Sequence, residues 1–305
     1  MNPLISIVGP TAAGKSRLAI SLAQQLNGEI VSADSRQVYR YMDIGTAKSS
    51  RQELSIVPHH LIDIINPDED FSLAQYQRLA YQAIGDIQKR EKLPIIAGGS
   101  GLYVWAVLEG WGIPEVPPDL ELRRKLGARA ASGETNALYQ ELVEVDPAAA
   151  RRIDPRNVRR LVRALEVSRN ADSIFSKLQS REAPPYDIQI IGLTAERAEL
   201  YRRIDTRVDK MIEQGLVEEV KKLVDRGYKL SLPAMSGIGY RQIGMFLNGD
   251  LTLEDATKQT KTETHRFVRR QYNWFRLSDD RINWFDITSS FEAEVSELVS
   301  RFISK

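Results

Sequence analysis

Short apolar runs alternate along the chain with longer segments in which apolar residues recur every three or four positions. Residues 4–8 form the first run, which has the length and composition of a buried strand. Further runs predict strands at residues 29–32, 61–65, 93–97, 188–193 and 282–287. The segment after the first run places its apolar residues on one helical face: Leu18, Ala19, Leu22, Ala23 and Leu26. This alternation is typical of an α/β domain with a parallel sheet.

Helical periodicity elsewhere predicts the helices that cover this sheet. Ser72 is a suitable N-cap for a helix that continues to about residue 91. Gly215 divides a later periodic segment into two helices. The later predicted helices cover residues 198–214, 216–224, 253–277 and 291–302.

The pattern changes in the middle of the chain. Prolines at 114, 117 and 118 open this segment, and prolines at 184 and 185 close it. Between them the periodicity is helical at residues 120–131, 138–145 and 158–168, with no run that predicts a strand. We therefore expect an all-helical insertion at residues 113–185 within an α/β core formed by residues 1–112 and 186–305.

Composition narrows the class of protein. Of the 305 residues 42% are hydrophobic, which is enough for a substantial core, and none is a cysteine. Disulfides and cysteine-ligated zinc are therefore excluded, and a reducing cytoplasm suits the sequence. We expect neither a membrane span nor a secretory signal, because no apolar run is long enough and the chain enters its first strand directly. A net charge of +1 gives no overall polyanion-binding signal.

A glycine-rich turn joins the first predicted strand to the first predicted helix. Its sequence matches the phosphate loop G-x-x-x-x-G-K-[ST] in the required context of strand, turn and helix. Backbone N–H groups and the helix N-terminus would bind phosphate oxygens there. Lys15 would add a full positive charge, and the Ser16 hydroxyl could hold a magnesium ion. The predicted polyphosphate-binding residues are Gly9, Pro10, Thr11, Ala12, Ala13, Gly14, Lys15 and Ser16.

Asp34 follows the second predicted strand, where polar groups of an open α/β sheet face the ligand crevice. Residues 95–99 read Ile-Ile-Ala-Gly-Gly, so the fourth strand lacks the acid that phosphate-loop hydrolases usually place beside the metal. Two reactions suit such a site. The phosphate itself could be attacked, or a diphosphate could leave during alkyl transfer. In both, Asp34 would accept a proton from the nucleophile, and spacing alone does not choose between them.

Two basic segments have alternative interpretations. Arginines concentrate in the insertion, where they could form a solvated face or bind a phosphate backbone: Arg151, Arg152, Arg156, Arg159, Arg160 and Arg163. The long helix at 253–277 carries several cations beside Tyr272, Trp274 and Phe275. These aromatic residues could belong to the core or stack on single-stranded nucleic acid. The histidines show no metal-ligand spacing, so we interpret them as structural or surface residues.

Nine segments together resemble the tRNA dimethylallyltransferases in order and spacing. They begin with the phosphate loop and the sequence Asp-Ser-Arg-Gln-Val-Tyr at 34–39, and end with Arg-Arg-Gln at 269–271. The resemblance covers nearly the whole chain through residues 9–16, 34–39, 42–48, 58–63, 98–103, 160–166, 203–207, 237–242 and 269–271. The ordered set is highly specific, although each segment beyond the phosphate loop is weak evidence by itself.

The resemblance implies transfer of a dimethylallyl group from dimethylallyl diphosphate to the exocyclic amine of an adenosine beside the anticodon, in tRNAs that read codons beginning with U. It implies a phosphate-loop NTPase-like fold with a helical insertion that binds the anticodon stem-loop, and magnesium as cofactor. Asp34 would be the general base, Lys15 and Ser16 would act on the diphosphate, and Arg203 would help to neutralise it. The implied tRNA-binding residues are Asp34, Ser35, Arg36, Gln37, Ser100, Arg123, Arg159, Arg160, Leu161, Val162, Arg163, Ser236, Gly237, Ile238, Gly239, Tyr240 and Arg241.

The reactivity of the adenine amine is consistent with this implied reaction. An adenine amine is a poor nucleophile because its lone pair is delocalised, so it requires a base and a good leaving group. The stacked adenosine would have to be flipped into the site, at a cost of a few kcal/mol. Tyr39 and Tyr103 are candidates to stack on it, with burial in the core as the alternative.

The sequence departs from the family pattern at two points. Ser100 stands where many relatives have threonine, and the hydroxyl is kept. The zinc-finger tail of eukaryotic relatives is absent, as the lack of cysteine requires, which indicates a bacterial or organellar type. We expect a monomer.

Three other functions remain open at this point. An adenylate isopentenyltransferase would use the same loop and Asp34 on free AMP, ADP or ATP. A small-molecule kinase would use ATP as phosphoryl donor, and a non-catalytic RNA-binding module would leave the loop and Asp34 unexplained.

Overall fold

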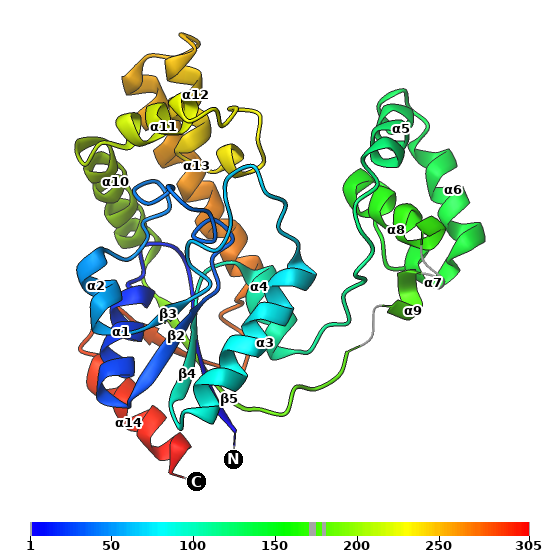
Figure 1. The fold of residues 1–305 in the computed structure, drawn as a ribbon. Coiled ribbons are helices and arrows are strands. Elements are labelled where there is room, and N and C mark those ends of the chain that lie inside the picture. The colour runs from blue at the N-terminus through cyan, green and yellow to red at the C-terminus, as the bar shows by residue number, and fades with distance from the viewer. Residues whose placement is uncertain (1, 171–174, 179–180, 305) are drawn as a thin grey trace. The chain divides into compact units, whose positions relative to one another are not determined.

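The computed structural model describes residues 2–170, 175–178 and 181–304. Its backbone divides into two compact units (Figure 1). The first comprises the chain up to Leu108 and from Pro185 onward, and the second comprises Glu109–Pro184. This division lies close to the boundaries predicted at residues 113 and 185. Within the predicted insertion, residues 171–174 and 179–180 lie outside the described part of the chain.

A parallel sheet forms the centre of the first unit. Its described strands lie in the order β3-β2-β4-β1-β5-β6, and every pairing is parallel. The predicted α/β fold is thereby confirmed. Because β1 pairs with β4 on one side and β5 on the other, the carboxyl end of β1 faces the ligand crevice expected at such a reversal of strand order. The strands are β1 Pro3–Val8, β2 Gly28–Ser32, β3 His59–His60, β4 Leu93–Ala97, β5 Asp187–Thr194 and β6 Ile282–Asp286.

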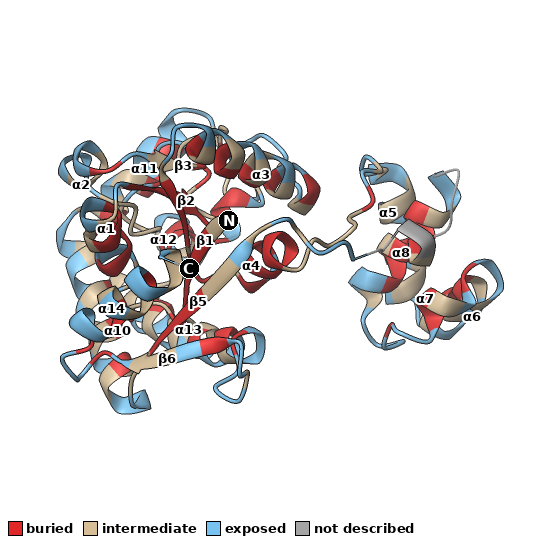
Figure 2. Ribbon diagram, turned by 90° about the horizontal axis from the view of Figure 1, so that it is seen from below, coloured by how far each residue is buried: buried red, intermediate tan, exposed pale blue. Residues whose placement is uncertain are grey.

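Helices cover both faces of this sheet, as Figure 2 shows. The side chain of Ser72 accepts a hydrogen bond from the backbone N–H of Gln75, which confirms Ser72 as the N-cap of α3. Gly215, at φ 99°, separates α10 from α11 as predicted. The helices are α1 Lys15–Gln25, α2 Arg51–Ile56, α3 Leu73–Lys89, α4 Gly101–Leu108, α10 Arg197–Glu213, α11 Leu216–Asp225, the short 3-10 helix Ala234–Ser236, α12 Tyr240–Leu247, α13 Leu253–Trp274 and α14 Glu292–Ile303.

The main hydrophobic core explains why the apolar runs form strands. Ile5 and Ile7 of β1 are fully buried, and they pack with Leu18 and Leu22 from the apolar face of α1. Each such side chain stabilises the fold by roughly 1.5–3 kcal/mol relative to an exposed one. The phosphate-loop candidate therefore lies between two elements that are held in the core.

The prediction of a strand at residues 61–65 is wrong. The described strand β3 is His59–His60, and it ends because Leu61 and Asp63 adopt positive φ angles of 63° and 56°. The backbone then bonds to an earlier loop, where Ile64 N–H donates to Val38 O at 2.9 Å. The sequence analysis also missed α2, a helix with six residues whose N-cap Ser50 forms a capping box with Glu53.

The second unit is built from helices around its own core. They are α5 Leu120–Ala131, α6 Thr135–Val145, α7 Pro147–Ala150, α8 Val158–Asn170 and α9 Phe175–Leu178. Leu126, Leu138, Leu142 and Leu161 are buried together in that core. A hydrogen bond joins the first and last segments of this unit, because Glu182 N–H donates to Gly110 O at 3.0 Å.

No helix in the described part of the chain combines the length and the apolar character that a membrane crossing requires.

Glu29, at the amino end of β2, is a buried acid with three basic residues as partners. Its carboxylate accepts hydrogen bonds from Lys92 (2.8 Å), Arg90 (2.6 Å) and His60 (2.7 Å). Burial alone would raise the pKa of Glu29, but the bonds from Lys92, His60 and Arg90 outweigh it and lower the pKa from 4.5 to about 2. The carboxylate therefore fastens β2 to the end of α3 and to β3.

We predict that Glu29→Gln destabilises the protein by about 2 kcal/mol at neutral pH, since hydrogen bonds to a charged group are lost. The pKa of Glu29 is lower in the folded state, so its contribution is complete above about pH 4.5 and is lost as the pH falls toward 2. Melting temperatures of wild type and variant should converge as the pH falls from about 4.5 to about 2. Glu213→Gln, at an exposed position, is the control. A difference that does not depend on pH would contradict the assigned role.

Candidate active site

The glycine-rich turn between β1 and α1 has the backbone of a phosphate-binding loop. Gly9 adopts φ 132°, and a Cβ at this position would lie 2.3 Å from Leu193 O on β5, so no other residue fits. Ala12 and Gly14 also have positive φ, at 65° and 84°. Lys15 Nζ donates to Pro10 O at 2.7 Å, so that the lysine folds over its own loop.

Two cations lie beside this loop. Burial, together with the positive charge of Arg207, lowers the pKa of Lys15 to about 8, while the nearby Asp34 carboxylate opposes this shift. Burial also lowers the pKa of Arg207, and Asp34 again opposes the shift. Arg207 lies within 3.5 Å of the Thr11 hydroxyl. This pair of neighbouring, partly desolvated cations favours the binding of a polyanion. Its negative charge would offset the cost of burying the two cations and the repulsion between them.

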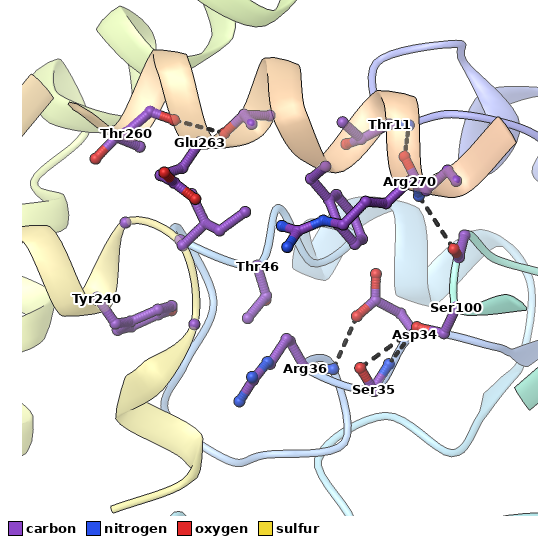
Figure 3. A pocket seen from close by; sticks show the side chains of 18 of the residues that line it. Thr11, Asp34, Ser35, Arg36, Thr46, Ser100, Tyr240, Thr260, Glu263 and Arg270 are labelled. Atoms are coloured by element: carbon purple, nitrogen blue, oxygen red, sulfur yellow. Dashed lines mark hydrogen bonds between the residues drawn. The ribbon is translucent and has the colours of Figure 1, made fainter. Parts of the chain in front are cut away.

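Asp34 follows β2, next to the glycine turn that follows β4. Its Oδ1 accepts a hydrogen bond from the backbone N–H of Arg36 at 2.8 Å, which orients the carboxylate. The neighbouring Ser35 N–H donates to Ser100 Oγ at 3.0 Å (Figure 3). The structure thus brings Asp34 and Ser100 together at the carboxyl edge of the sheet, as the sequence predicted for Asp34.

These groups open into a cavity of about 560 Å³ within the first unit. The phosphate loop contributes Thr11, and Arg207 lines the same cavity. Other residues that the sequence predicted for the site also line this cavity, and most of them belong to segments 34–36 and 236–241. These residues are Asp34, Ser35, Arg36, Ser100, Ser236, Gly237, Ile238, Gly239, Tyr240 and Arg241.

A match to the family model described as IPP transferase extends over residues 37–278. The chain belongs to this family. It is 48% identical over 304 residues to a tRNA dimethylallyltransferase of Dehalococcoides mccartyi, which covers 100% of this chain and 94% of the relative. It is 50% identical over 303 residues to a tRNA dimethylallyltransferase of Roseiflexus sp., with 99% of each chain covered.

Solved structures of this family have the same fold. The full-length tRNA isopentenylpyrophosphate transferase of Bacillus halodurans aligns with a TM-score of 0.74 at 42% identity, over 100% of this chain and 97% of that one. A eukaryotic dimethylallyltransferase acting on tRNA aligns with a TM-score of 0.82 at 28% identity, over 99% of this chain and 79% of that one. The resemblance found in the sequence is confirmed at the level of family, fold and enzyme class.

Some predicted site residues of this IPP transferase family member lie outside the cavity lining. Arg203 Nε donates to Glu199 at 2.6 Å, and its proposed action on the diphosphate stays a prediction. Gln37 supports the loop after β2, because its amide donates to Thr46 O and accepts from Ser32 Oγ.

The predicted tRNA-binding arginines of the insertion divide into two kinds. Arg123 and Arg163 surround the buried Glu166, which accepts hydrogen bonds from Arg123 at 2.7 and 2.9 Å and from Arg163 at 2.6 Å. Arg159 and Arg160 are exposed. Leu161 and Val162 are buried in the core of this unit, so their side chains support the helix that carries the arginines.

The aromatic residues proposed for stacking differ in how far they are buried and in whether they line the cavity. Tyr39 and Tyr103 are largely buried, and Tyr103 stacks on Tyr76 with ring centroids 3.9 Å apart, yet it still lines the cavity. On α13, Phe275 at the helix end is fully buried, whereas Trp274 is 39% exposed and lines the cavity. Burial confirms the core interpretation for Phe275, whereas stacking of nucleic acid on Trp274 stays a prediction.

The histidines have the structural role predicted for them. His265 lies 2.8 Å from Asp205 and stacks on Tyr201, while His60 bonds to Glu29. The described residues contain no group of three or more His, Cys, Asp or Glu side chains that could hold a metal. Ser16 is exposed at the start of α1, and its hydroxyl makes no hydrogen bond to another described residue. One such hydroxyl suits magnesium, which commonly takes one or two protein oxygens and completes its shell with phosphates and water.

Two residues of the site lie in segments that carry the family resemblance but received no role from the sequence. Arg207 lies four positions after Arg203, so helical spacing was a signal that could have identified it. Gln271 is fully buried, and its Oε1 accepts the Thr11 N–H at 2.9 Å while its Nε2 donates to Gly99 O at 3.1 Å. It joins the phosphate loop to the turn after β4. Because Thr11 lies 260 positions before Gln271 in the sequence, no local pattern predicts this contact.

We predict that Gln271→Ala leaves the Thr11 N–H and the Gly99 carbonyl without partners and destabilises the protein by about 1–3 kcal/mol. The phosphate loop should lose its alignment, so affinity for inorganic diphosphate should fall several-fold. Calorimetry of melting and of diphosphate binding measures both effects. Gln259→Ala, on the exposed side of the same helix, should change neither. Unchanged diphosphate affinity would show that the loop keeps its shape without this clamp.

Proposed function

We propose that this protein transfers a dimethylallyl group from dimethylallyl diphosphate to the exocyclic amine of the adenosine beside the anticodon, in tRNAs that read codons beginning with U. The observation that carries the proposal is one cavity lined by Thr11 of the phosphate loop, by the cation Arg207 of α10 and by the carboxylate of Asp34. The names of relatives, tRNA dimethylallyltransferase and tRNA isopentenylpyrophosphate transferase, support the same reaction.

The donor diphosphate would bind to the phosphate loop. Backbone N–H groups, Lys15 and Arg207 would stabilise the charge that develops on the leaving diphosphate, a role supported by the contact of Arg207 with Thr11. We propose that Ser16 holds a magnesium ion, which when bound would neutralise further charge between the two phosphates. Arg203 lies one helical turn before Arg207, and we keep it as a second candidate for this role.

Apolar side chains from α10 and α13 would hold the five-carbon group. Ile204, Val208 and Met211 lie on one face of α10, and Phe267 faces the same cavity from α13. An apolar lining excludes water from the allylic carbon, which protects the donor from hydrolysis.

Asp34 would act as the general base. The adenine nitrogen forms a bond to the allylic carbon as the bond from that carbon to the diphosphate oxygen breaks, and the amine proton passes to the Asp34 carboxylate. The hydrogen bond from Arg36 N–H already holds this carboxylate in one orientation. The adenosine would reach it by leaving the anticodon-loop stack.

We propose that the anticodon stem-loop binds to both units. Around the cavity the contacts would come from Ser35, Arg36, Ser100 and the segment 236–241. In the insertion, the exposed Arg159 and Arg160 would bind backbone phosphates, and Glu166 would hold Arg123 and Arg163 in place. We also propose a monomer that works in the cytoplasm, where its tRNA substrate is found.

A label-transfer experiment tests this function and separates it from the alternatives. Labelled dimethylallyl diphosphate and magnesium are offered with unmodified tRNA, with tRNA lacking the adenosine beside the anticodon, and with AMP. We expect label in the first tRNA alone. Label in AMP would instead identify an adenylate isopentenyltransferase, and consumption of ATP without tRNA would identify a kinase.

Asp34→Asn is the matched variant for the chemical step, because the amide oxygen can still accept the Arg36 N–H while the base is removed. Turnover should fall about 10²–10⁴-fold, the usual contribution of a general base. Affinity for tRNA, measured by filter binding, should stay within a few-fold. Equal loss of turnover and affinity would contradict the general-base assignment.

We predict that Arg160→Ala weakens tRNA binding and reduces the slope of log affinity against log salt by about one, because one phosphate contact is lost. Binding titrations at several salt concentrations measure this slope. Arg156→Ala is the control, since Arg156 is exposed on the same unit but paired with Asp154 at 2.8 Å. An unchanged slope would remove Arg160 from the set of phosphate contacts.

A further inference from the structure

Glu219, in the first turn of α11, makes an unusual set of contacts. Its carboxylate accepts hydrogen bonds from three successive backbone N–H groups, those of Asp43 (3.0 Å), Ile44 (2.8 Å) and Gly45 (3.2 Å). It also accepts the hydroxyl of Tyr240 at 2.5 Å. A single side chain therefore joins α11, the loop after β2 and the start of α12. Bonds of this kind, with an ionised acceptor, are stronger than those between neutral groups.

Two of the groups that Glu219 holds are walls of the cavity. Gly45 and Tyr240 both line it, and Thr46 lies beside them. The Tyr240 ring packs directly against the backbone of Gly45. There is no room between them for a side chain, since a Cβ added to Gly45 would lie 2.4 Å from the ring. The Tyr240 side chain is buried, and burial together with Glu219 raises its pKa well above the ordinary value, so its hydroxyl stays a proton donor.

The rest of this wall is also fixed. Lys48 is buried, and its ammonium binds Asp43 and Asp63, each at 2.6 Å, which holds the far end of the loop. Arg36 donates to Pro233 O at 2.8 Å and so connects the turn of Asp34 to the segment that leads into Tyr240. Glu219 supplies the remaining link between that segment and the loop at 43–46.

This wall lies away from the phosphate loop. In Figure 3, Thr46 and Tyr240 are on one side of the cavity and Thr11 is on the other, with Asp34 and Arg36 facing the space that remains. The Thr11 side, with Arg207, is where the proposed diphosphate binds. The wall held by Glu219 is therefore the side available to the nucleoside acceptor.

We infer that Glu219 is a positioning residue that sets the acceptor side of the cavity, by fixing Gly45 and Thr46 against Tyr240. The inference rests on the proposed function for the identity of the acceptor. Productive geometry in an active site must be held to a fraction of an ångström, and loops reach that precision through supporting hydrogen bonds. Glu219 acts through these two walls and touches no reacting atom.

Glu219→Gln tests this role, with Glu218→Gln as the matched control, because Glu218 is an exposed neighbour in the same helical turn. A glutamine would place its NH2 donor where the carboxylate now accepts bonds from three backbone N–H groups and the Tyr240 hydroxyl. Steady-state label transfer to an unmodified anticodon stem-loop should show KM for RNA raised roughly tenfold, with KM for dimethylallyl diphosphate within about twofold of wild type. Glu218→Gln should match wild type in both.

Hydrogen exchange gives a readout that does not depend on activity. The amides of residues 43–45 should exchange about tenfold faster in Glu219→Gln, since their common acceptor is weakened. Tyr240→Phe removes the hydroxyl that bonds to Glu219 and leaves the bonds from Asp43 and Ile44 to Glu219 intact, so it should give a smaller rise in KM for RNA and unchanged exchange at residues 43 and 44. This second variant decides the question if Glu219→Gln does not fold.

Equal rises in KM for both substrates would overturn the inference, because Glu219 would then support the fold in general. Faster exchange with unchanged KM for RNA would also overturn it, since the wall would not matter to the acceptor. If the wild type transfers no label, the proposed function fails. Direct RNA affinity, measured by fluorescence anisotropy, then decides the role of Glu219 separately: a loss in Glu219→Gln supports it, and no loss overturns it.

Discussion

The buried amide of Gln271 holds together two loops that the sheet alone leaves unconnected. Parallel strands place the phosphate loop after β1 and the glycine turn after β4 at one edge, but they do not fix the distance between these loops. Gln271 does so by bonding to Thr11 N–H and to Gly99 O. Because it belongs to the long helix α13, the same helix aligns the cavity wall formed by Phe267, Arg270 and Trp274 with both loops.

Charge then divides the cavity into two ends. Lys15 and Arg207 crowd the phosphate-loop end, and each has its pKa lowered by burial, which makes this end unfavourable without an anion. Asp34 lies close enough to oppose both shifts. A diphosphate would bind the cations and leave Asp34 able to accept a proton from the nucleophile. One electrostatic arrangement therefore serves both the leaving group and the acceptor.

Local signals were sufficient for the sheet, the phosphate loop and the cap at Ser72, because each depends on residues close together in the sequence. The strand predicted at 61–65 failed because Leu61 and Asp63 turn the backbone to positive φ in order to bond with the loop near Val38. Gln271 and Glu219 received no role from the sequence for a related reason, since their partners lie far away in it. Sequence patterns predict elements well, whereas they say little about which side chain joins one element to another.

In the helical insertion, the contacts of one buried carboxylate distinguish arginines that the sequence pattern does not. The sequence did not distinguish Arg163 from Arg159 and Arg160, but the buried Glu166 binds Arg163 together with Arg123 and leaves Arg159 and Arg160 exposed. A carboxylate that fixes Arg123 and Arg163 lowers the entropy that those side chains would lose on binding RNA, but it also neutralises part of their charge. The exposed pair retains its full charge and flexibility. In the proposed RNA complex, shape recognition by the held pair and electrostatic attraction by the exposed pair would therefore be separable contributions of one helical unit.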